Sequence, residues 1–291
     1  MTKEKQIDLH VHSTASDGSF TPTEVVTEAI KSGLAAIALT DHDTGAGIPE
    51  AQAAAKELSD DFFVIAGTEL SCEYENPSLG IRPTELHILG YYIDPLQKDF
   101  IEITNLVVHR REERNRKMAE NFTQAGIPMT IEELKGGNPD TIITRSHFAR
   151  LLLEKGVIKK REEAFTRYLS KDSKFYVKRQ FLTPEEAINT IKKAGGVPVL
   201  AHPLLYHLPE KKLPVVVEEL KDMGIRGLEA IYTMNSGLDE GDMRALARKC
   251  GLFITGGSDF HGANKPTTGI GVGFGNLRIP MSLLDAIQQA R

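Results

Sequence analysis

Metal-ligand side chains follow the ends of short apolar runs at four separate places in this chain. These places are residues 10–12, 40–43, 201–203 and 257–261, which read His-Val-His, Thr-Asp-His-Asp, Ala-His-Pro and Gly-Ser-Asp-Phe-His. A short apolar run bounded in this way is typical of a buried strand. Imidazoles and carboxylates gathered at strand ends predict a site that binds several metal ions.

The first of these segments, residues 7–12, alternates strictly between apolar and ionisable side chains. In extended backbone the alternation gives one apolar face and one ionisable face, which carries Asp8, His10 and His12. Three titratable groups on the inner face of a strand cost several kcal/mol if they stay unpaired, and a bound cation removes that cost. The tripeptide alone also fits a surface strand or a satisfied core histidine, but the other three segments favour a metal site.

The length of 291 residues suffices for one large α/β barrel or two modest domains. No apolar stretch approaches the roughly 20 residues that a membrane span needs, so we expect a soluble, unsecreted, cytoplasmic protein with no membrane partner. The cysteines, Cys72 and Cys250, have no CxxC partner, which argues against a disulfide framework or a zinc knuckle. Nothing in the sequence points to an obligate protein partner.

Strand and helix patterns alternate along most of the chain, which predicts a parallel sheet with helices around it. Between residues 99 and 180 only helical patterns occur, so this segment is expected to be a helical, substrate-binding insertion between strands four and five. It divides the predicted α/β barrel into a first part, residues 1–98, and a second part, residues 181–291. The seven expected strands lie at residues 7–12, 35–40, 62–66, 86–91, 197–201, 225–230 and 252–258.

Loops at the carboxyl ends of the strands of a closed barrel converge on one mouth, where residues remote in sequence meet. An open doubly wound sheet is the alternative, but it would gather ligands only at a switch point. Nine donors exceed what one ion can use, so two or three divalent ions are expected, with Glu69 bridging a pair. Imidazoles and carboxylates without thiolates suit Mn²⁺, Fe²⁺ or Zn²⁺. The nine predicted ligands are His10, His12, Asp17, His42, Glu69, His87, His202, Asp259 and His261.

Closely spaced ions of this kind favour phosphoester hydrolysis, because they activate a bridging water and stabilise the entering and leaving oxygens. We expect this bridging hydroxide to be held by Glu69, His202 and Asp259. Hydrolysis of a C–N bond is a competing interpretation, since the same hydroxide attacks a carbonyl carbon equally well.

An uneven charge distribution points to an anionic substrate. Residues 100–180 contain 17 basic and 11 acidic side chains, whereas the rest of the chain contains 18 basic and 29 acidic ones. A basic segment facing an acidic, metal-rich body suits an anion that bridges the two. An ordinary solvated helical surface with i,i+4 ion pairs is an equally simple explanation.

Within the insertion, the run Thr144-Arg145-Ser146-His147 opens a helix. An arginine and a histidine beside free helix N-terminal amides predict a phosphate site, although a plain helix start with a solvated arginine gives the same pattern. Arg114, one turn after Arg110 on the preceding helix, is a further candidate, and Lys265 is a weaker one.

Several other polar residues are expected to play supporting parts or none. Asp8 and Asp41 are placed to accept the second imidazole N–H of the ligands. Asp43 is either a similar support or a loop cap. His109 lies on a charged helix and is expected to be exposed, and His207 has no second ligand nearby.

Together these motifs resemble those of the PHP (polymerase and histidinol phosphatase) metal-dependent phosphoesterases. The resemblance spans nearly the whole chain and implies a distorted (β/α)₇ barrel. By analogy, a first ion would bind His10, His12, Glu69 and Asp259, a second Glu69, His87 and His202, and a third Asp17, His42 and His261. Several family members have histidine where this chain has Asp17, which implies a preference for harder ions such as Mn²⁺.

The insertion is similar to that of small bacterial members that act on nucleoside 3′,5′-bisphosphates and on the 5′ ends of short RNAs. Those members have a Gly-Arg-Pro-His run that holds the 5′-phosphate, where this chain retains Arg145 and His147 but not the glycine and proline. The resemblance therefore implies release of a 3′-phosphate from a bisphosphate, or cleavage of 5′-phosphorylated RNA. The alternatives are a histidinol phosphate phosphatase-like monoesterase and a non-catalytic, metal-stabilised module.

Overall fold

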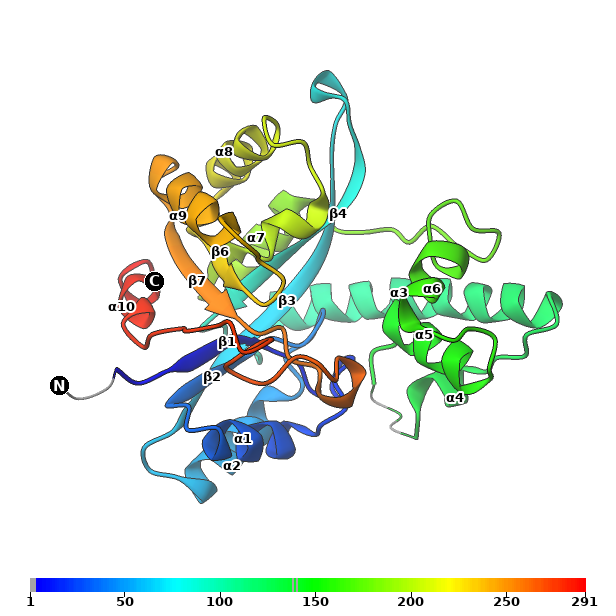
Figure 1. Ribbon diagram of the computed structural model, residues 1–291, viewed down its shortest axis with the longest axis horizontal. Coiled ribbons are helices and arrows are strands. Elements are labelled where there is room, and N and C mark those ends of the chain that lie inside the picture. Colours follow the sequence, from blue (N-terminus) through cyan, green and yellow to red (C-terminus); the bar gives the residue numbers. More distant parts are fainter. Residues whose placement is uncertain (1–3, 138, 140) are drawn as a thin grey trace.

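The computed structural model describes residues 4–137, 139 and 141–291, and its core is one seven-stranded sheet (Figure 1). Neighbouring strands follow chain order throughout. A parallel bridge between Val11 and Phe260 brings the first strand alongside the segment after the last, so the sheet nearly closes into a barrel. The strands are β1 Ile7–Val11, β2 Ala36–Leu39, β3 Phe63–Asn76, β4 Ile81–Tyr91, β5 Val197–Leu200, β6 Gly227–Tyr232 and β7 Phe253–Gly257.

The predicted all-parallel sheet is wrong at one strand. β4 pairs antiparallel with both β3 and β5, whereas the remaining neighbours are parallel. The reason is local: β3 continues to Asn76, and a tight turn over Pro77–Leu79 that ends on left-handed Gly80 reverses the chain with no helix between the strands. Glu69 and His87 therefore lie within strands rather than after them.

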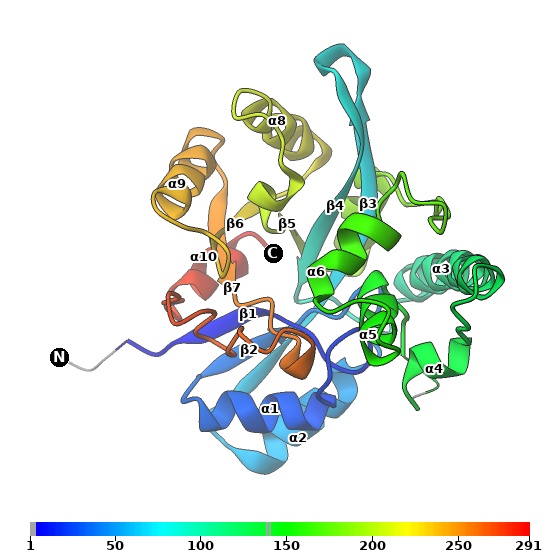
Figure 2. The same ribbon diagram turned by 45° about the vertical axis from the view of Figure 1, so that its right-hand side comes forward.

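Helices cover the outside of the barrel (Figure 2). Two of these helices begin with a capping box, which Thr21 and Thr183 each form with the glutamate three residues later. Among the described residues, no helix has the length and apolar character needed to cross a membrane. The covering helices are α1 Pro22–Lys31, α2 Ile48–Leu58, α7 Pro184–Lys193, α8 Leu213–Met223, α9 Asp239–Lys249 and α10 Leu283–Gln289.

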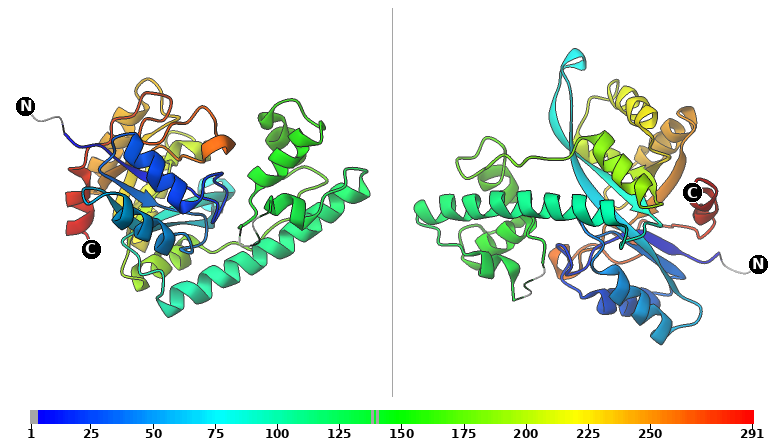
Figure 3. Two further views of the ribbon diagram at one scale, coloured as in Figure 1. Left: turned by 90° about the horizontal axis from the view of Figure 1, so that it is seen from below. Right: turned by 180° about the vertical axis from the view of Figure 1, so that it is seen from behind.

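The chain between β4 and β5 forms the expected helical insertion. Its longest element, α3 Lys98–Gln124, extends past the barrel and carries the other helices on one side (Figure 3). These are α4 Ile131–Lys135, α5 Arg145–Glu154 and α6 Arg161–Glu163, the last continued by a π-helical turn over Ala164–Tyr168. The insertion has its own apolar core, in which Phe122 stacks on Phe175 with ring centroids 4.2 Å apart. The outer limits 99 and 180 remain predictions.

Candidate metal centre

All nine predicted ligands lie in one buried region at the mouth of the barrel. Their nitrogen and oxygen atoms form four overlapping groups, and within each group the atoms lie within 4.8 Å of one another. The groups are His12, Asp17, His42 and His261; His10, Glu69 and His202; His10, His12 and Asp259; and His42, Glu69 and His87.

Glu69 is the centre of this cluster. Its Oε1 lies 2.8 Å from His87 Nδ1 and 3.0 Å from His202 Nε2. Its Oε2 lies 3.0 Å from His42 Nδ1, 3.3 Å from His12 Nε2 and 3.4 Å from His10 Nε2. Burial would raise the pKa of the Glu69 carboxyl, but the surrounding imidazoles hold it well below its ordinary value.

Asp17 and Asp259 extend the cluster around His261. Asp17 Oδ1 lies 3.1 Å from His261 Nε2 and 3.8 Å from His42 Nε2. Asp259 Oδ1 lies 3.3 Å from His261 Nδ1 and 3.4 Å from His12 Nε2. Four residues each belong to two of the four ligand groups, as a site for several ions requires. They are His10, His12, His42 and Glu69.

The nitrogen and oxygen atoms of the cluster do not satisfy one another by hydrogen bonds, and bound cations would satisfy them better. His10 Nε2 and His12 Nε2 face each other at 3.1 Å, so at most one proton can lie between them. Four buried atoms in the region, Asp17 Oδ1, Glu69 Oε2, His42 Nδ1 and His202 Nδ1, make no well-aligned hydrogen bond among the described residues, although Glu69 Oε2 lies 3.0 Å from His42 Nδ1 and Asp17 Oδ1 lies 3.1 Å from His261 Nε2. Unpaired buried acceptors are rare in proteins, and a divalent ion satisfies several at once.

Backbone geometry at the strand ends turns these side chains inward. His202 and Asp259 adopt φ angles of 24° and 57°, in or near the left-handed region that non-glycine residues seldom occupy. At the end of β7, Gly257 lies against His10, since a Cβ placed on it would come within 2.1 Å of the His10 Cβ. A glycine is therefore needed for β7 to approach β1 here.

The carboxylate that orients the histidines is one that the sequence analysis missed. Buried Glu229, in the middle of β6, lies 2.9 Å from His10 Nδ1 and accepts the backbone N–H of His202 at 2.8 Å. Asp8 and Asp41, which were predicted in this role, instead hold loops. Asp8 accepts hydrogen bonds from the backbone N–H groups of Ser258 and Gly271. Asp41 accepts hydrogen bonds from the backbone N–H of Ser13 and the hydroxyl of Ser16.

A cavity of about 160 Å³ lies between the metal-ligand cluster and the insertion. It shares Asp17, His42 and His87 with the metal-ligand cluster. From the other side four arginines line it, Arg111, Arg114, Arg145 and Arg179, and we call this space the arginine cavity. Its wall also contains Glu85 and three aromatic side chains, Phe165, Tyr176 and Phe181.

Two carboxylates are shared by three of the four arginines. Asp43 Oδ2 pairs with Arg111 and lies 3.3 Å from Arg179 Nη1, so it acts as neither a histidine support nor a simple loop cap. Glu85 accepts a hydrogen bond from Arg145 at 2.7 Å. Leaving out the metal ligands, the four arginines are opposed only by Asp43 and Glu85 among the described residues. The cavity and its immediate partners therefore carry two more positive than negative charges.

Arg114 is the guanidinium without a carboxylate partner. It is buried, its Nη1 contacts only Met118 Sδ at 3.6 Å, and its Nε has no hydrogen-bond partner among the described residues. Burial, together with the charges of Arg111, Arg179 and Arg145, lowers its pKa to about 9. A buried cation without a counter-charge is unfavourable, and an anion placed beside it would remove that cost.

The other predicted substrate contacts lie in different settings. Thr144 and Arg145 line the cavity, and the Thr144 hydroxyl donates to Asp17 Oδ2 at 2.9 Å, which joins the insertion to the metal-ligand cluster. His147 is buried, and its Nδ1 accepts the Thr144 backbone N–H at 3.0 Å. Lys265 lies 2.6 Å from Asp259 and is not a lining residue.

Arg110 and the two histidines given little weight, His109 and His207, belong to neither the metal-ligand cluster nor the lining of the arginine cavity. Arg110 is not among the residues that line the arginine cavity. His109 is exposed beside Glu113, and His207 is exposed in the loop after β5.

Three cavity residues escaped the sequence analysis for different reasons. Arg111 had a signal: the apolar stripe of α3 through Val107 and Met118 passes over positions 111 and 114. Glu85 also had a signal, because it lies two residues before His87 and so on the same face of the strand, whereas Arg179 lies in a segment without a motif or a clear periodicity.

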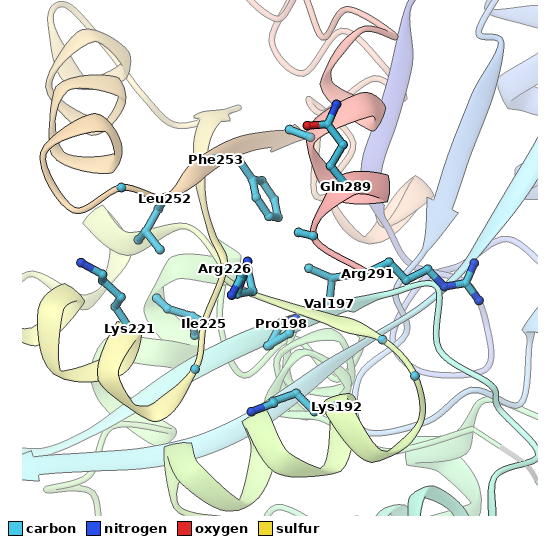
Figure 4. A pocket seen from close by; sticks show the side chains of 16 residues that line it. Lys192, Val197, Pro198, Lys221, Ile225, Arg226, Leu252, Phe253, Gln289 and Arg291 are labelled. Atoms are coloured by element: carbon cyan, nitrogen blue, oxygen red, sulfur yellow. The ribbon is translucent and has the colours of Figure 1, made fainter.

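A larger cavity, of about 890 Å³, lies at the opposite end of the barrel (Figure 4). Lys192, Lys221 and Arg226 line it, but none of the nine predicted ligands does. Lys192 and Lys221 belong to the last turns of α7 and α8, where cations stabilise the helix dipole. The same C-terminal dipoles disfavour an anion, so this cavity is a poor site for phosphate chemistry.

Comparison with known proteins agrees with this geometry. The PHP domain profile matches residues 8–178. A 5′-3′ exoribonuclease from Haemophilus influenzae is 35% identical over 258 residues, covering 88% of this chain and 90% of its own length. A 3′,5′-nucleoside bisphosphate phosphatase from Chromobacterium violaceum is 35% identical over 258 residues, covering 88% of this chain and 87% of its own length.

A solved structure from Bifidobacterium adolescentis, provisionally described as a metal-dependent phosphoesterase, superposes with a TM-score of 0.83. It is 28% identical, and the match covers 98% of this chain and 96% of the other. The similarity therefore includes the insertion as well as the barrel.

Proposed function

The chain belongs to the PHP family and is a metal-dependent phosphoesterase, and from this premise we propose that it removes the 3′-phosphate of nucleoside 3′,5′-bisphosphates and degrades short 5′-phosphorylated RNA. The names of the two relatives support these substrates, and they favour phosphoester over C–N hydrolysis. The observation that carries the proposal is the arginine cavity, which adjoins the metal-ligand cluster and has an excess of positive charge.

We infer that the cluster holds two or three divalent ions, with Mn²⁺ the first candidate. By the family resemblance, a first ion would bind His10, His12, Glu69 and Asp259, a second Glu69, His87 and His202, and a third Asp17, His42 and His261. The groups in the structure divide differently at Glu69, which groups with His10 and His202 and also with His42 and His87. When bound, the ions would supply Lewis-acid activation of water and neutralise the charge that develops at phosphorus. The imidazole and carboxylate donors, without thiolates, support this choice of metal class.

The chain's own residues would position the substrate. Arg145 and the unpaired Arg114 would bind a second phosphate, while Thr144 fixes the insertion against Asp17. Phe165 and Tyr176, on the cavity wall, present aromatic surface of the kind on which a nucleobase stacks. Binding energy from the second phosphate would then orient the scissile one, so that the distance between the two phosphates selects the substrate.

Phosphate release across a substrate panel tests this function. The panel contains adenosine 3′,5′-bisphosphate, a short 5′-phosphorylated RNA, adenosine 3′-monophosphate and histidinol phosphate, each with Mn²⁺-loaded protein and with chelator. We expect the first two substrates to react fastest, and chelator to abolish the reaction. In Arg145→Ala the loss should be confined to those two substrates, whereas Arg116→Ala, which removes an exposed arginine of α3, should behave as wild type.

Equal rates on the bisphosphate and the 3′-monophosphate would refute a role for the second phosphate. Preferred turnover of histidinol phosphate would instead establish a monoesterase.

A further inference from the structure

Among the residues that the structure describes, Glu85 is the one carboxylate lining the arginine cavity apart from the predicted ligand Asp17. It lies on β4 two residues before His87, with about one-fifth of its side chain exposed. Its Oε2 accepts the Arg145 hydrogen bond at 2.7 Å, and its Oε1 lies 3.9 Å from Arg179 and 3.6 Å from His87 Nε2. Held between the guanidinium groups of Arg145 and Arg179, Glu85 places a fixed negative charge inside an anion site.

A fixed negative charge opposes every anion that enters, and the opposition grows with the charge of the anion. Coulomb energy is proportional to the product of the charges, so a triphosphate end is penalised more than a single terminal phosphate. Specificity of this kind arises from a built-in repulsion as well as from attraction. The two excess positive charges of the cavity match one phosphate dianion.

The size of the cavity points the same way. Its volume of about 160 Å³ is below the range of roughly 300 Å³ and more that is usual for a whole drug-sized ligand. It therefore suits one group of a substrate that extends beyond it.

We propose that Glu85 is a specificity-determining residue, which limits the arginine cavity to an anchor with the charge of one terminal phosphate. A 5′-monophosphate is accepted, and 5′-di- and triphosphate ends are disfavoured. Glu85 touches neither the scissile phosphate nor its leaving group in this arrangement, and it acts through Arg145 and Arg179. This inference rests on the proposed function, because it assigns the cavity to the 5′ end of the substrate.

Binding of adenosine 5′-monophosphate and adenosine 5′-triphosphate, measured by calorimetry in the presence of chelator, tests the inference without the metal ions. Wild type should bind the monophosphate more tightly than the triphosphate. Glu85→Gln should tighten monophosphate binding by at least about tenfold and triphosphate binding by a larger factor, so that the preference shrinks or reverses. Glu85→Asp keeps the charge and should keep the preference.

Two controls separate this effect from general changes. Glu73→Gln removes the same charge from the residue directly opposite Glu85 in the β3–β4 ladder. Glu73 pairs with Lys178 outside the cavity lining, so this variant should retain the wild-type preference. Arg145→Ala should weaken binding of both nucleotides, which identifies the site being measured.

An unchanged preference in Glu85→Gln overturns the inference alone, provided that Mn²⁺-loaded wild type hydrolyses adenosine 3′,5′-bisphosphate. If wild type hydrolyses neither the bisphosphate nor the 5′-phosphorylated RNA, the proposed function fails, and this inference fails with it.

Discussion

Individual residues at the metal centre are held by partners that lie outside the cluster. Glu69 lies within 3.4 Å of five imidazoles, and each imidazole can present only one of its nitrogens to the centre. The contact between Glu229 and His10 Nδ1 leaves His10 Nε2 facing Glu69. Partners of this kind fix the tautomer and the orientation of a ligand before an ion arrives.

Glu229→Gln is therefore expected to weaken metal binding while the protein stays folded. The amide oxygen can still accept a hydrogen bond from His10 Nδ1 but lacks the negative charge of the carboxylate, so the imidazole is less well oriented and less basic. Loss of a supporting carboxylate typically costs about 10–100-fold in metal affinity. Mn²⁺ titration by calorimetry measures the change, and Glu57→Gln on the exposed surface of α2 is the control. Unaltered Mn²⁺ affinity would show that Glu229 does not support the centre.

Gly257→Ala should damage the same centre through packing. The new Cβ would lie 2.1 Å from the His10 Cβ, so β1 or β7 must shift. Such overpacking typically costs about 1–3 kcal/mol in the free energy of unfolding. Urea denaturation and Mn²⁺ titration are both expected to show losses.

Gly241→Ala is the matched control, since a Cβ at this position on α9 meets nothing within 4 Å. Alanine in a helix should raise stability slightly. Equal effects of the two substitutions would contradict the close approach of β7 to His10.

The nine clustered residues could be predicted because each follows or interrupts a short apolar run, which is a local signal. Glu229 interrupts such a run too, as the one charged residue of β6, but it has no second ligand nearby in sequence. Glu85 and Arg179 meet only through the tertiary fold. A functional residue can therefore be predicted where a local sequence motif marks it, but not where its role depends on contacts formed only in the tertiary fold.

At the scale of elements, the N-terminus of α5 shows how one helix start serves both the fold and the site. The Thr144 side chain caps the helix and reaches Asp17, while the imidazole of His147 accepts the Thr144 backbone N–H. This reciprocal capping fixes the position of Arg145 between them. The predicted helix start was thus found, but the mutual capping depends on side-chain orientations that a sequence does not give.

The stability of this element should depend on pH through His147. Burial lowers its pKa to about 4 from the ordinary 6.5, so the unfolded chain binds more protons between these values. The contribution of neutral His147 to the free energy of unfolding is fully present above pH 6.5 and is lost as the pH falls toward 4. Glutamine at this position keeps a capping box without titrating.

His147→Gln should therefore remove up to about 3 kcal/mol of acid destabilisation between pH 6.5 and 4. The measurement is the urea midpoint of both proteins across this range. Parallel curves for the two proteins would show that the His147 imidazole is not held neutral by burial.

The β3–β4 hairpin shows that the direction of a strand could not be predicted from the sequence. Both strands were expected from their apolar patterns, but a parallel arrangement was assumed because the other strands alternate with helices. Only the contact between strands reveals that β3 runs on to Asn76 and that the chain reverses at Gly80. Strand direction is a property of the sheet, so no single strand pattern specifies it.

At the scale of the whole molecule, two bodies of opposite charge share one site. All four arginines of the arginine cavity come from the basic segment 100–180, and the metal-ligand cluster comes entirely from the barrel. Arg111 pairs with Asp43, and Arg161 of the insertion donates to the Asn264 carbonyl, so the two bodies are joined beside the site (Figure 2). Under the proposed function, catalysis and anchoring of the substrate would belong to separate cores.

This division predicts that the two functions can be separated by a substitution at a residue that belongs to neither the metal-ligand cluster nor the lining of the arginine cavity. Phe122→Ala removes a fully buried ring that stacks on Phe175 in the insertion core, which should destabilise the insertion by about 3–5 kcal/mol. Displaced arginines should raise KM for the bisphosphate, whereas hydrolysis of a lone phosphomonoester and the bound Mn²⁺ content should stay near wild type. Hydrogen exchange should show faster exchange in α3 and α5 but not in β1 or β7. Loss of Mn²⁺ together with the insertion would mean that the barrel cannot assemble its ligands alone, and that the two bodies form a single cooperative unit.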